Sequence, residues 1–302
     1  MSRNKGMALA LMTALISGIS VFVNGVAVKL ADPFAYTTLK NIGALGFILI
    51  AALALGQARH LLNVPRSRVP LLVLIGIIGG SIPFLMFFWG LKLGGPAVSS
   101  FIYRSLFIFA GVFGYFILRE NPSPREYAGA LLILLGNALL VSGDLVLGAG
   151  QLLVLGATVL WALEYTVSRK VLSDVHPSAV MASRMLFGAI VLLAFLGFSG
   201  TLPSLAQAGV EILPWLLLTS LLLAGFLLSW YNCLKHLPVL RATSVLALGG
   251  VITAALEAFF LGKAFTPFEG FGLLLIVIGV AIAASLRELF EAAREPEKSM
   301  VA

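Results

Sequence analysis

Five ionisable side chains lie inside long apolar stretches of the sequence, where a charge needs a partner or a function. They are Lys40, Arg104, Glu164, Arg184 and Glu257. By position along their stretches, Glu164 and Arg184 fall at one depth and can pair, whereas the other three fall toward the opposite side. Such residues form gates and proton relays in some proteins and fixed ion pairs in others, and both alternatives stay open here.

Polar and aromatic residues recur at helical spacing in the same stretches. One face carries Ser17, Ser20 and Asn24, and a later segment carries Trp161, Glu164 and Ser168 with Tyr165 beside them. These faces either line a cavity or hold helices together through hydrogen bonds. Phe84, Phe88, Trp230 and Tyr231 form an aromatic wall or, alternatively, face lipid and mark its interface.

We therefore predict that the binding chemistry consists of a few hydrogen-bonding groups among aromatic rings. The candidate binding residues are Asn24, Ser20, Phe84, Phe88, Ser100, Tyr103, Trp161, Tyr165 and Ser244. The candidate gating or coupling residues are the five ionisable ones. Glu164 and Glu257 are the acids placed to carry protons.

The composition determines where these residues must lie. The chain has 302 residues, of which 60% are hydrophobic and 11% are charged, and its mean hydropathy is +1.05. A soluble domain would expose too much of this apolar surface, so the sequence predicts a polytopic helical membrane protein. One cysteine and three scattered histidines provide no disulfide and no metal site, and we expect no cofactor. The net charge of +7 is attributed to membrane orientation and not to nucleic-acid binding.

Ten apolar runs predict ten membrane-spanning helices, the first of which is a helix and not a cleaved signal peptide. Pro83, which follows Gly79 and Gly80, predicts a kink or local unwinding in the third helix. The expected ranges are 7–28, 34–55, 70–91, 97–118, 126–142, 149–168, 178–197, 212–232, 239–260 and 268–286.

The distribution of basic residues predicts the orientation. With a cytoplasmic N-terminus, 14 of the 20 Lys and Arg residues fall in inner segments and three fall in outer loops. This bias predicts that both termini are cytoplasmic, in the inner membrane of a cell.

The two halves of the sequence align with each other. Residues 88–92 match 231–235 at an offset of 143, which also pairs Pro124 with Pro267, while Lys40 pairs with Arg184 at an offset of 144. Because five helices are an odd number, the second half must enter the membrane from the opposite side. The fold class is therefore an all-α membrane protein of ten transmembrane helices in two inverted five-helix repeats. The predicted boundaries are 1–143 and 144–290, followed by a polar cytoplasmic tail at 291–302.

With these repeats and the element from Leu118 to Pro124, which reads Leu-Arg-Glu-Asn-Pro-Ser-Pro, the sequence resembles the drug/metabolite transporter superfamily. It is most similar to the ten-helix EamA-type exporters, and among them to bacterial exporters of aromatic and other neutral amino acids. In the second half Lys263 stands where the family usually has Glu, at a loop position taken to be structural. The resemblance implies a cavity between the halves, with the fifth and tenth helices as scaffold.

The sequence thus predicts a secondary transporter, not an enzyme, that exports amino acids or similar small metabolites by alternating access. Another cargo, a drug cation or a nucleotide-sugar, is the alternative, and a membrane-embedded lipid enzyme is a distant one because its catalytic motifs are missing. Expected partners are a small-molecule substrate and membrane lipid, with proton coupling left open. Gly129 and Gly136, repeated as Gly272 and Gly279, predict packing of the fifth helix on the tenth in a monomer, with homodimerisation as the alternative.

Overall fold

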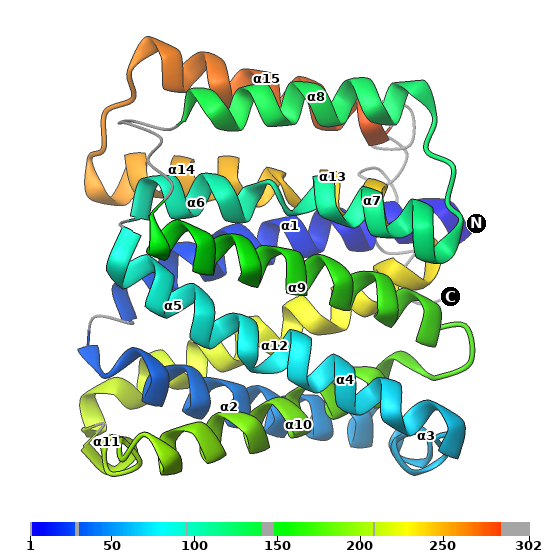
Figure 1. Cartoon of the computed structure of the whole chain (residues 1–302), viewed down its shortest axis with the longest axis vertical. Helices are drawn as coiled ribbons and strands as arrows, with labels where there is room; N and C mark the ends of the chain where they lie inside the picture. Colours follow the sequence, from blue (N-terminus) through cyan, green and yellow to red (C-terminus); the bar gives the residue numbers. More distant parts are fainter. Residues whose placement is uncertain (1, 28–29, 95, 141–147, 208, 285–302) are drawn as a thin grey trace.

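The computed structural model describes residues 2–27, 30–94, 96–140, 148–207 and 209–284, and every regular element in these ranges is helical. Ten crossings run back and forth along one bundle (Figure 1). Those of the first half are α1 (Ser2–Ala27), α2 (Pro33–Ala54), α4 (Val69–Gly80) with α5 (Ile82–Gly94), α6 (Pro96–Arg104) with α7 (Leu106–Leu118), and α8 (Pro124–Leu139). Those of the second half are α9 (Ala149–Val171), α10 (Pro177–Phe198), α12 (Leu213–His236), α13 (Val239–Leu246) with α14 (Leu248–Leu261), and α15 (Pro267–Ala284).

The predicted membrane architecture is confirmed. Nine helical stretches in the described part of the chain are long and apolar enough to cross a membrane, and α8, with 16 residues, makes the tenth crossing. Short elements cover the ends of the bundle: α3 (Ala58–Leu62), η2 (Arg66–Arg68), α11 (Ser204–Gln207) and η3 (Val210–Ile212).

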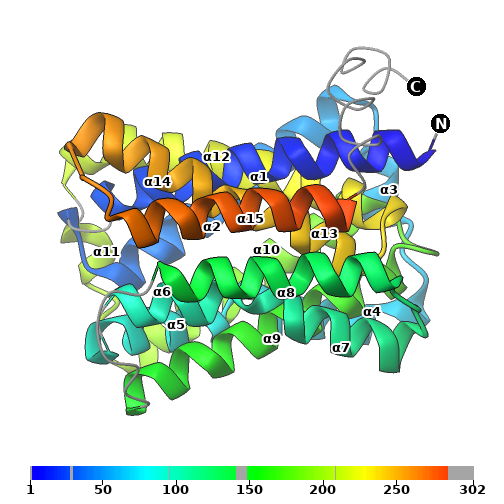
Figure 2. The ribbon, with the colours of Figure 1, turned by 90° about the horizontal axis from the view of Figure 1, so that it is seen from above.

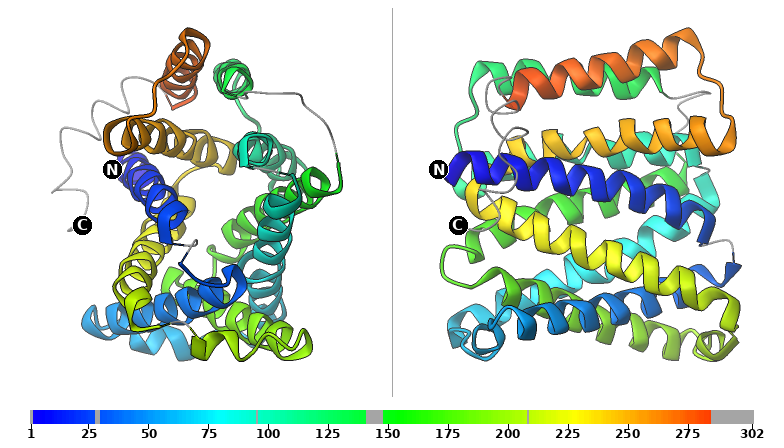
Figure 3. Two further views of the ribbon diagram at one scale, coloured as in Figure 1. Left: turned by 90° about the vertical axis from the view of Figure 1, so that its left-hand side faces the viewer. Right: turned by 180° about the vertical axis from the view of Figure 1, so that it is seen from behind.

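The two repeats interlock instead of standing side by side. The first helix of each half packs on the third and fourth crossings of the other half, so α1 lies against α12 and α14 while α9 lies against α5 and α7. The second helices do the same, with α2 on α12 and α10 on α4. The end-on view shows how helices of both halves alternate around the bundle (Figure 3, left).

The third crossing is broken where Pro83 predicts it. Pro has no N–H to donate to the carbonyl four residues earlier, and its ring crowds that carbonyl. Helix α4 therefore ends at Gly80, Ser81 leaves helical geometry at φ −140° and ψ −76°, and α5 begins at Ile82. The corresponding crossing of the second half, α12, runs unbroken through 24 residues.

Two crossings predicted to be continuous, 97–118 and 239–260, are also broken, each at a single residue. The first break is at Ser105, whose hydroxyl donates a 2.6 Å hydrogen bond to the Ile102 carbonyl while its N–H is shared between the Phe101 and Ile102 carbonyls, each at 3.1 Å. The second is at Ala247, whose N–H donates to the Ser244 carbonyl, three residues back. The breaks occupy almost equivalent places in the two repeats, so they belong to the repeated unit.

Helices α8 and α15 form an antiparallel pair at one side of the bundle (Figures 1 and 2). Equivalent caps start them, since the Ser123 N–H donates to Glu126 at 2.7 Å and the Thr266 N–H donates to Glu269 at 2.8 Å. A Cβ on Gly129 would lie 2.4 Å from the Gly279 carbonyl oxygen, and one on Gly136 would lie 2.5 Å from that of Gly272. The predicted packing of the fifth helix on the tenth is confirmed.

Gly279→Ala is expected to lower the unfolding temperature of the purified protein in detergent, because the new Cβ would lie 2.7 Å from the Gly129 carbonyl oxygen. Overpacking of this kind costs about 1–3 kcal/mol. Gly270→Ala on the same helix is the matched control, since a Cβ there meets no atom within 4 Å. Equal unfolding temperatures for the two variants would contradict the close packing of α8 and α15.

Candidate functional site

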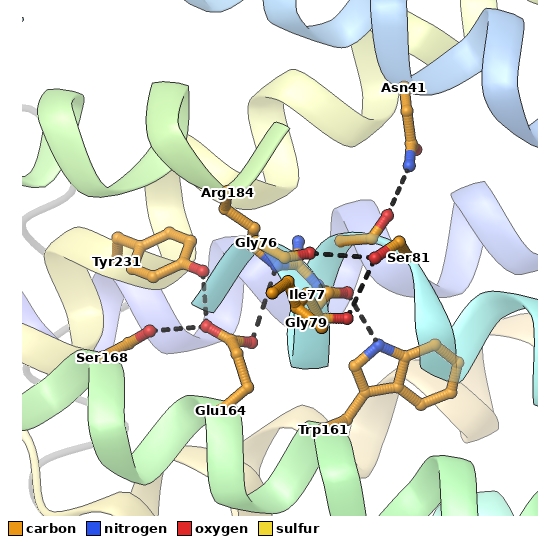
Figure 4. A network of polar contacts seen from close by, with 11 residues as sticks. Asn41, Gly76, Ile77, Gly79, Ser81, Trp161, Glu164, Ser168, Arg184 and Tyr231 are labelled. Atoms are coloured by element: carbon orange, nitrogen blue, oxygen red, sulfur yellow. Dashed lines mark hydrogen bonds and ion pairs between the residues drawn. The ribbon is translucent and has the colours of Figure 1, made fainter. Parts of the chain in front are cut away.

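The break between α4 and α5 places two backbone carbonyls at the centre of the bundle (Figure 4). The Gly79 carbonyl accepts from the Trp161 indole at 3.1 Å and from Arg184 Nη2 at 2.9 Å. The Gly80 carbonyl accepts from the Asn41 amide at 3.0 Å. Side chains of α9, α10 and α2 thus satisfy the hydrogen bonds that the interrupted helix cannot make.

The predicted pair of Glu164 and Arg184 is present beside this break. Glu164 Oε2 lies 3.6 Å from Arg184 Nε, and both side chains are buried. Glu164 Oε1 accepts from the Ser168 hydroxyl at 2.5 Å and from the Tyr231 hydroxyl at 2.6 Å. All three partners point at the carboxylate in Figure 4. Four elements, α9, α10, α12 and the α4–α5 break, therefore meet at one ionic cluster.

Gly79 allows that close approach. A Cβ at this position would lie 2.5 Å from Glu164 Cγ and 2.8 Å from Arg184 Nε. Any side chain here would push the ion pair away from the helix break.

Three aromatic rings surround the Trp161 indole; we call Phe84, Phe87, Tyr103 and Trp161 the aromatic box. The Trp161 centroid lies 5.2 Å from Phe84, 5.7 Å from Phe87 and 5.3 Å from Tyr103. These tilted and edge-to-face contacts are favourable aromatic geometries. The hydrogen bond to Gly79 fixes the orientation of the indole. The box comes from α5, α6 and α9, with Trp161, Phe84 and Tyr103 among the predicted residues.

Lys40 lies on α2 with only neutral groups among its described contacts. Its Nζ donates to Asn24 Oδ1 at 3.2 Å and lies 5.7 Å from the ring centroids of Tyr36 and Phe84. The Asn24 amide in turn donates to the Ser20 carbonyl at 2.7 Å and to the Ser20 hydroxyl at 3.1 Å. The predicted residues Ser20, Asn24 and Lys40 are therefore brought together, and Phe84 joins them to the aromatic box.

The remaining predicted residues lie outside these groups. Phe88 contacts Phe87, and Tyr165 contacts Trp230 at a centroid distance of 4.7 Å. Ser244 is buried in α13, and Arg104 packs against Gly250 of α14. Glu257 pairs with Lys263 at 3.1 Å near the end of α14, away from the ionic cluster. The side chain of Ser100 lies outside the described residues.

Some site residues were not predicted, or were given another interpretation. Phe87 was missed because Phe87 and Phe88 follow Phe84 at i+3 and i+4 on one helix, so both share its face and the spacing cannot decide between them. Trp230 and Tyr231 are fully buried and not at a lipid interface. Asn41 was not predicted, although an amide inside an apolar stretch is itself a sign of a buried hydrogen bond.

A second polar cluster ties the halves together at the end of the bundle where α1 begins; we call it the Glu120 latch. Glu120 accepts from Arg169 Nε at 2.6 Å and from the Val239 N–H at the start of α13 at 2.8 Å. Arg169 also donates to the Leu234 carbonyl near the end of α12. A charged cleft of about 480 Å³ opens beside the latch, lined by Leu118, Glu120, Arg169, Lys170, Leu172, Ser173 and Lys235.

The equivalent latch cannot form at the opposite end. At the offset of 143, Lys263 replaces Glu120 and Pro96, which has no N–H, replaces Val239. The chain reversal itself is kept, because Arg119 at φ 55° and Gly262 at φ 65° both end their helices in left-handed geometry. The two ends of the bundle are therefore closed by different interactions.

Comparison with known proteins supplies a family. A model of the EamA-like transporter family matches residues 4–142 and again residues 148–285. A "Probable amino-acid metabolite efflux pump" of Salmonella typhimurium is 27% identical over 304 residues, which cover 93% of this chain and 95% of that protein. An "Uncharacterized transporter" of Methanothermobacter thermautotrophicus is 27% identical over 233 residues, covering 73% of this chain and 66% of the other.

One solved crystal structure matches this fold with a TM-score of 0.80 and 20% sequence identity, covering 95% of this chain and 99% of that chain. At this identity the match concerns the fold alone.

Glu120→Ala is expected to expose the ends of α9, α12 and α13, because it removes both bonds of the latch carboxylate. Cys233, the one cysteine of the sequence, is fully buried on α12 next to Leu234 and serves as the probe. Since hydrogen bonds to charged groups contribute about 1.5–3 kcal/mol, labelling of Cys233 by a maleimide should accelerate about tenfold or more.

The control for the latch variant is Glu211→Ala, which removes an exposed carboxylate at the opposite end of the bundle. Both variants should elute as monodisperse folded protein, so that labelling reports local opening. Labelling of Glu120→Ala at the wild-type rate would show that the latch does not hold this end closed.

Proposed function

Because the chain belongs to the EamA-like transporter family, we propose that it exports amino acids with aromatic or other bulky neutral side chains. The observation that carries the proposal is the aromatic box, which offers ring faces and edges to an apolar group in the interior of the bundle. The relative of Salmonella typhimurium, named as an amino-acid metabolite efflux pump, supports the same class of cargo.

The proposed movement is alternating access between the interlocked repeats. Inverted repeats allow one set of contacts to adopt two related arrangements around a central site. The excess of basic residues in alternate loops supports a cytoplasmic position of both termini, and in this orientation the Glu120 latch closes the cytoplasmic end. In this scheme the aromatic box binds the cargo, and the Glu164–Arg184 cluster couples α9 and α10 to the α4–α5 break. In this proposal the protein acts as a monomer in the inner membrane.

The buried charges weigh against one alternative cargo. Lys40 and Arg184 are buried cations and Glu164 is a buried acid already paired with Arg184. A drug cation entering this interior would meet an excess of positive charge, which disfavours it.

The test is efflux of labelled phenylalanine or tryptophan from liposomes that contain the purified protein. Wild-type protein is expected to give saturable efflux above that of empty liposomes, and Trp161→Ala should reduce it about tenfold or more, because the central ring of the box is lost. Trp89→Ala is the control, since Trp89 lies 47% exposed on α5 and stacks on Phe34 outside the box.

Equal losses in the two tryptophan variants would remove the box from the cargo site. No efflux from folded wild-type protein would remove the assignment to aromatic amino acids.

A further inference from the structure

We propose that Lys40 binds the carboxylate of the cargo, and that the site recognises this group without recognising an α-amino group. The inference rests on the proposed function and narrows its substrate class to small carboxylates with an aromatic or bulky apolar group. Phenylalanine belongs to that class, and so do its hydroxy-acid and deaminated analogues.

Lys40 has no acid partner among the described residues. It is 6% exposed, and its described contacts are an amide oxygen and two ring faces. Among the residues that the structure describes, no carboxylate oxygen lies within 4.0 Å of its Nζ. An ammonium group has three N–H donors, and the bond to Asn24 uses one of them. A charge held in a membrane interior by neutral groups alone is suited to receive an anion.

The repeat gives Lys40 an equivalent residue that does have an acid partner. At the offset of 144, Lys40 corresponds to Arg184, Ser20 corresponds to Glu164, and Asn24 corresponds to Ser168. In the second half, Glu164 neutralises Arg184 within the protein. In the first half, Ser20 takes the place of that acid, so the same fold leaves the Lys40 charge without its internal partner.

Lys40 lies next to the aromatic box. Phe84 lies under the Lys40 ammonium and also contacts the Trp161 indole, with a centroid separation of 5.2 Å between the two rings. A cargo whose carboxylate binds Lys40 can therefore place its apolar group against Phe84 and Trp161. Asn24 holds the ammonium in place, because its amide is fixed by Ser20 on α1.

Among the described residues, no acid inside the bundle is left unpaired to bind an ammonium. Glu164 already binds Ser168, Tyr231 and Arg184. Glu257 pairs with Lys263 at the far end of α14. Lys40 therefore offers the cargo a positive charge next to the aromatic box.

The experiment measures equilibrium binding of labelled phenylalanine to the purified full-length protein in nanodiscs, with three unlabelled competitors. 3-Phenyllactate keeps the carboxylate and replaces the amine, 3-phenylpropanoate lacks the amine, and phenethylamine lacks the carboxylate. Both carboxylates are expected to compete within about tenfold of phenylalanine, and phenethylamine should be weaker by at least about tenfold.

Variants test the residue itself. Lys40→Gln should weaken phenylalanine binding by at least about tenfold, because the positive charge that binds the carboxylate is lost. The unfolding temperature should not fall, because the charge that is removed has no acid partner in the membrane interior. Ser20→Glu should also weaken phenylalanine binding, because the new carboxylate can pair with Lys40 as Glu164 pairs with Arg184 and so compete with the carboxylate of the cargo. Ser20→Gln has similar size and no charge, so a greater loss in Ser20→Glu isolates the effect of charge. Lys263→Gln is the control for removing a lysine outside the site.

The outcomes separate the two proposals. If labelled phenylalanine does not bind to folded wild-type protein, the proposed function fails. If it binds phenylalanine but Lys40→Gln and Ser20→Glu bind as tightly as wild type, the cargo assignment survives and Lys40 is not its anchor. If phenethylamine competes as well as 3-phenylpropanoate, recognition through the carboxylate is overturned.

Discussion

A hydrogen bond that Pro83 cannot make organises the centre of this protein. Inside a membrane no water satisfies a free carbonyl, and each unsatisfied backbone group costs several kcal/mol. The Gly79 and Gly80 carbonyls therefore require donors, and Asn41, Trp161 and Arg184 supply them from three different helices. These bonds fix the indole around which the aromatic box forms and the guanidinium that neutralises Glu164. One local defect thus determines the positions of both groups.

The repeat gives each half the same backbone fold, and single residue differences at equivalent positions give the two halves different interactions. Ser20 and Glu164 occupy equivalent positions on α1 and α9, so Lys40 has no acid partner among the described residues whereas Arg184 pairs with Glu164. Glu120 and Lys263 are likewise equivalent, and only the first binds a helix start of the other half. Removing one partner of a buried pair such as Glu164 and Arg184 costs about 3–5 kcal/mol, because the other charge is left uncompensated.

Much of the architecture could be predicted because it follows from composition and local chemistry. Apolar runs predicted the crossings, the self-alignment predicted the inverted repeat, and the Gly-Gly-Ser-Ile-Pro run at Gly79 predicted the break. The breaks at Ser105 and Ala247 could not be predicted, because they involve one residue each and contain no proline. Tyr231 was hard to assign to Glu164, since 67 positions separate them and their meeting depends on how α12 packs on α9. Phe87 was missed because it and Phe88, three and four residues after Phe84, share one face of α5, and only the packing against Trp161 distinguishes them.

The same contacts limit how the bundle can move. Trp161 and Arg184 both bind the Gly79 carbonyl, so α4 cannot shift against α9 without disturbing the aromatic box and the ion pair together. Lys40 is joined to this unit through Phe84, and through Asn24 to α1, which packs on the third and fourth crossings of the other half. An anion bound at Lys40 would change the charge at the junction of α1, α2 and α5. Because a ligand shifts an equilibrium only through its different affinity for the two states, this junction is where cargo binding can act on the arrangement of the repeats.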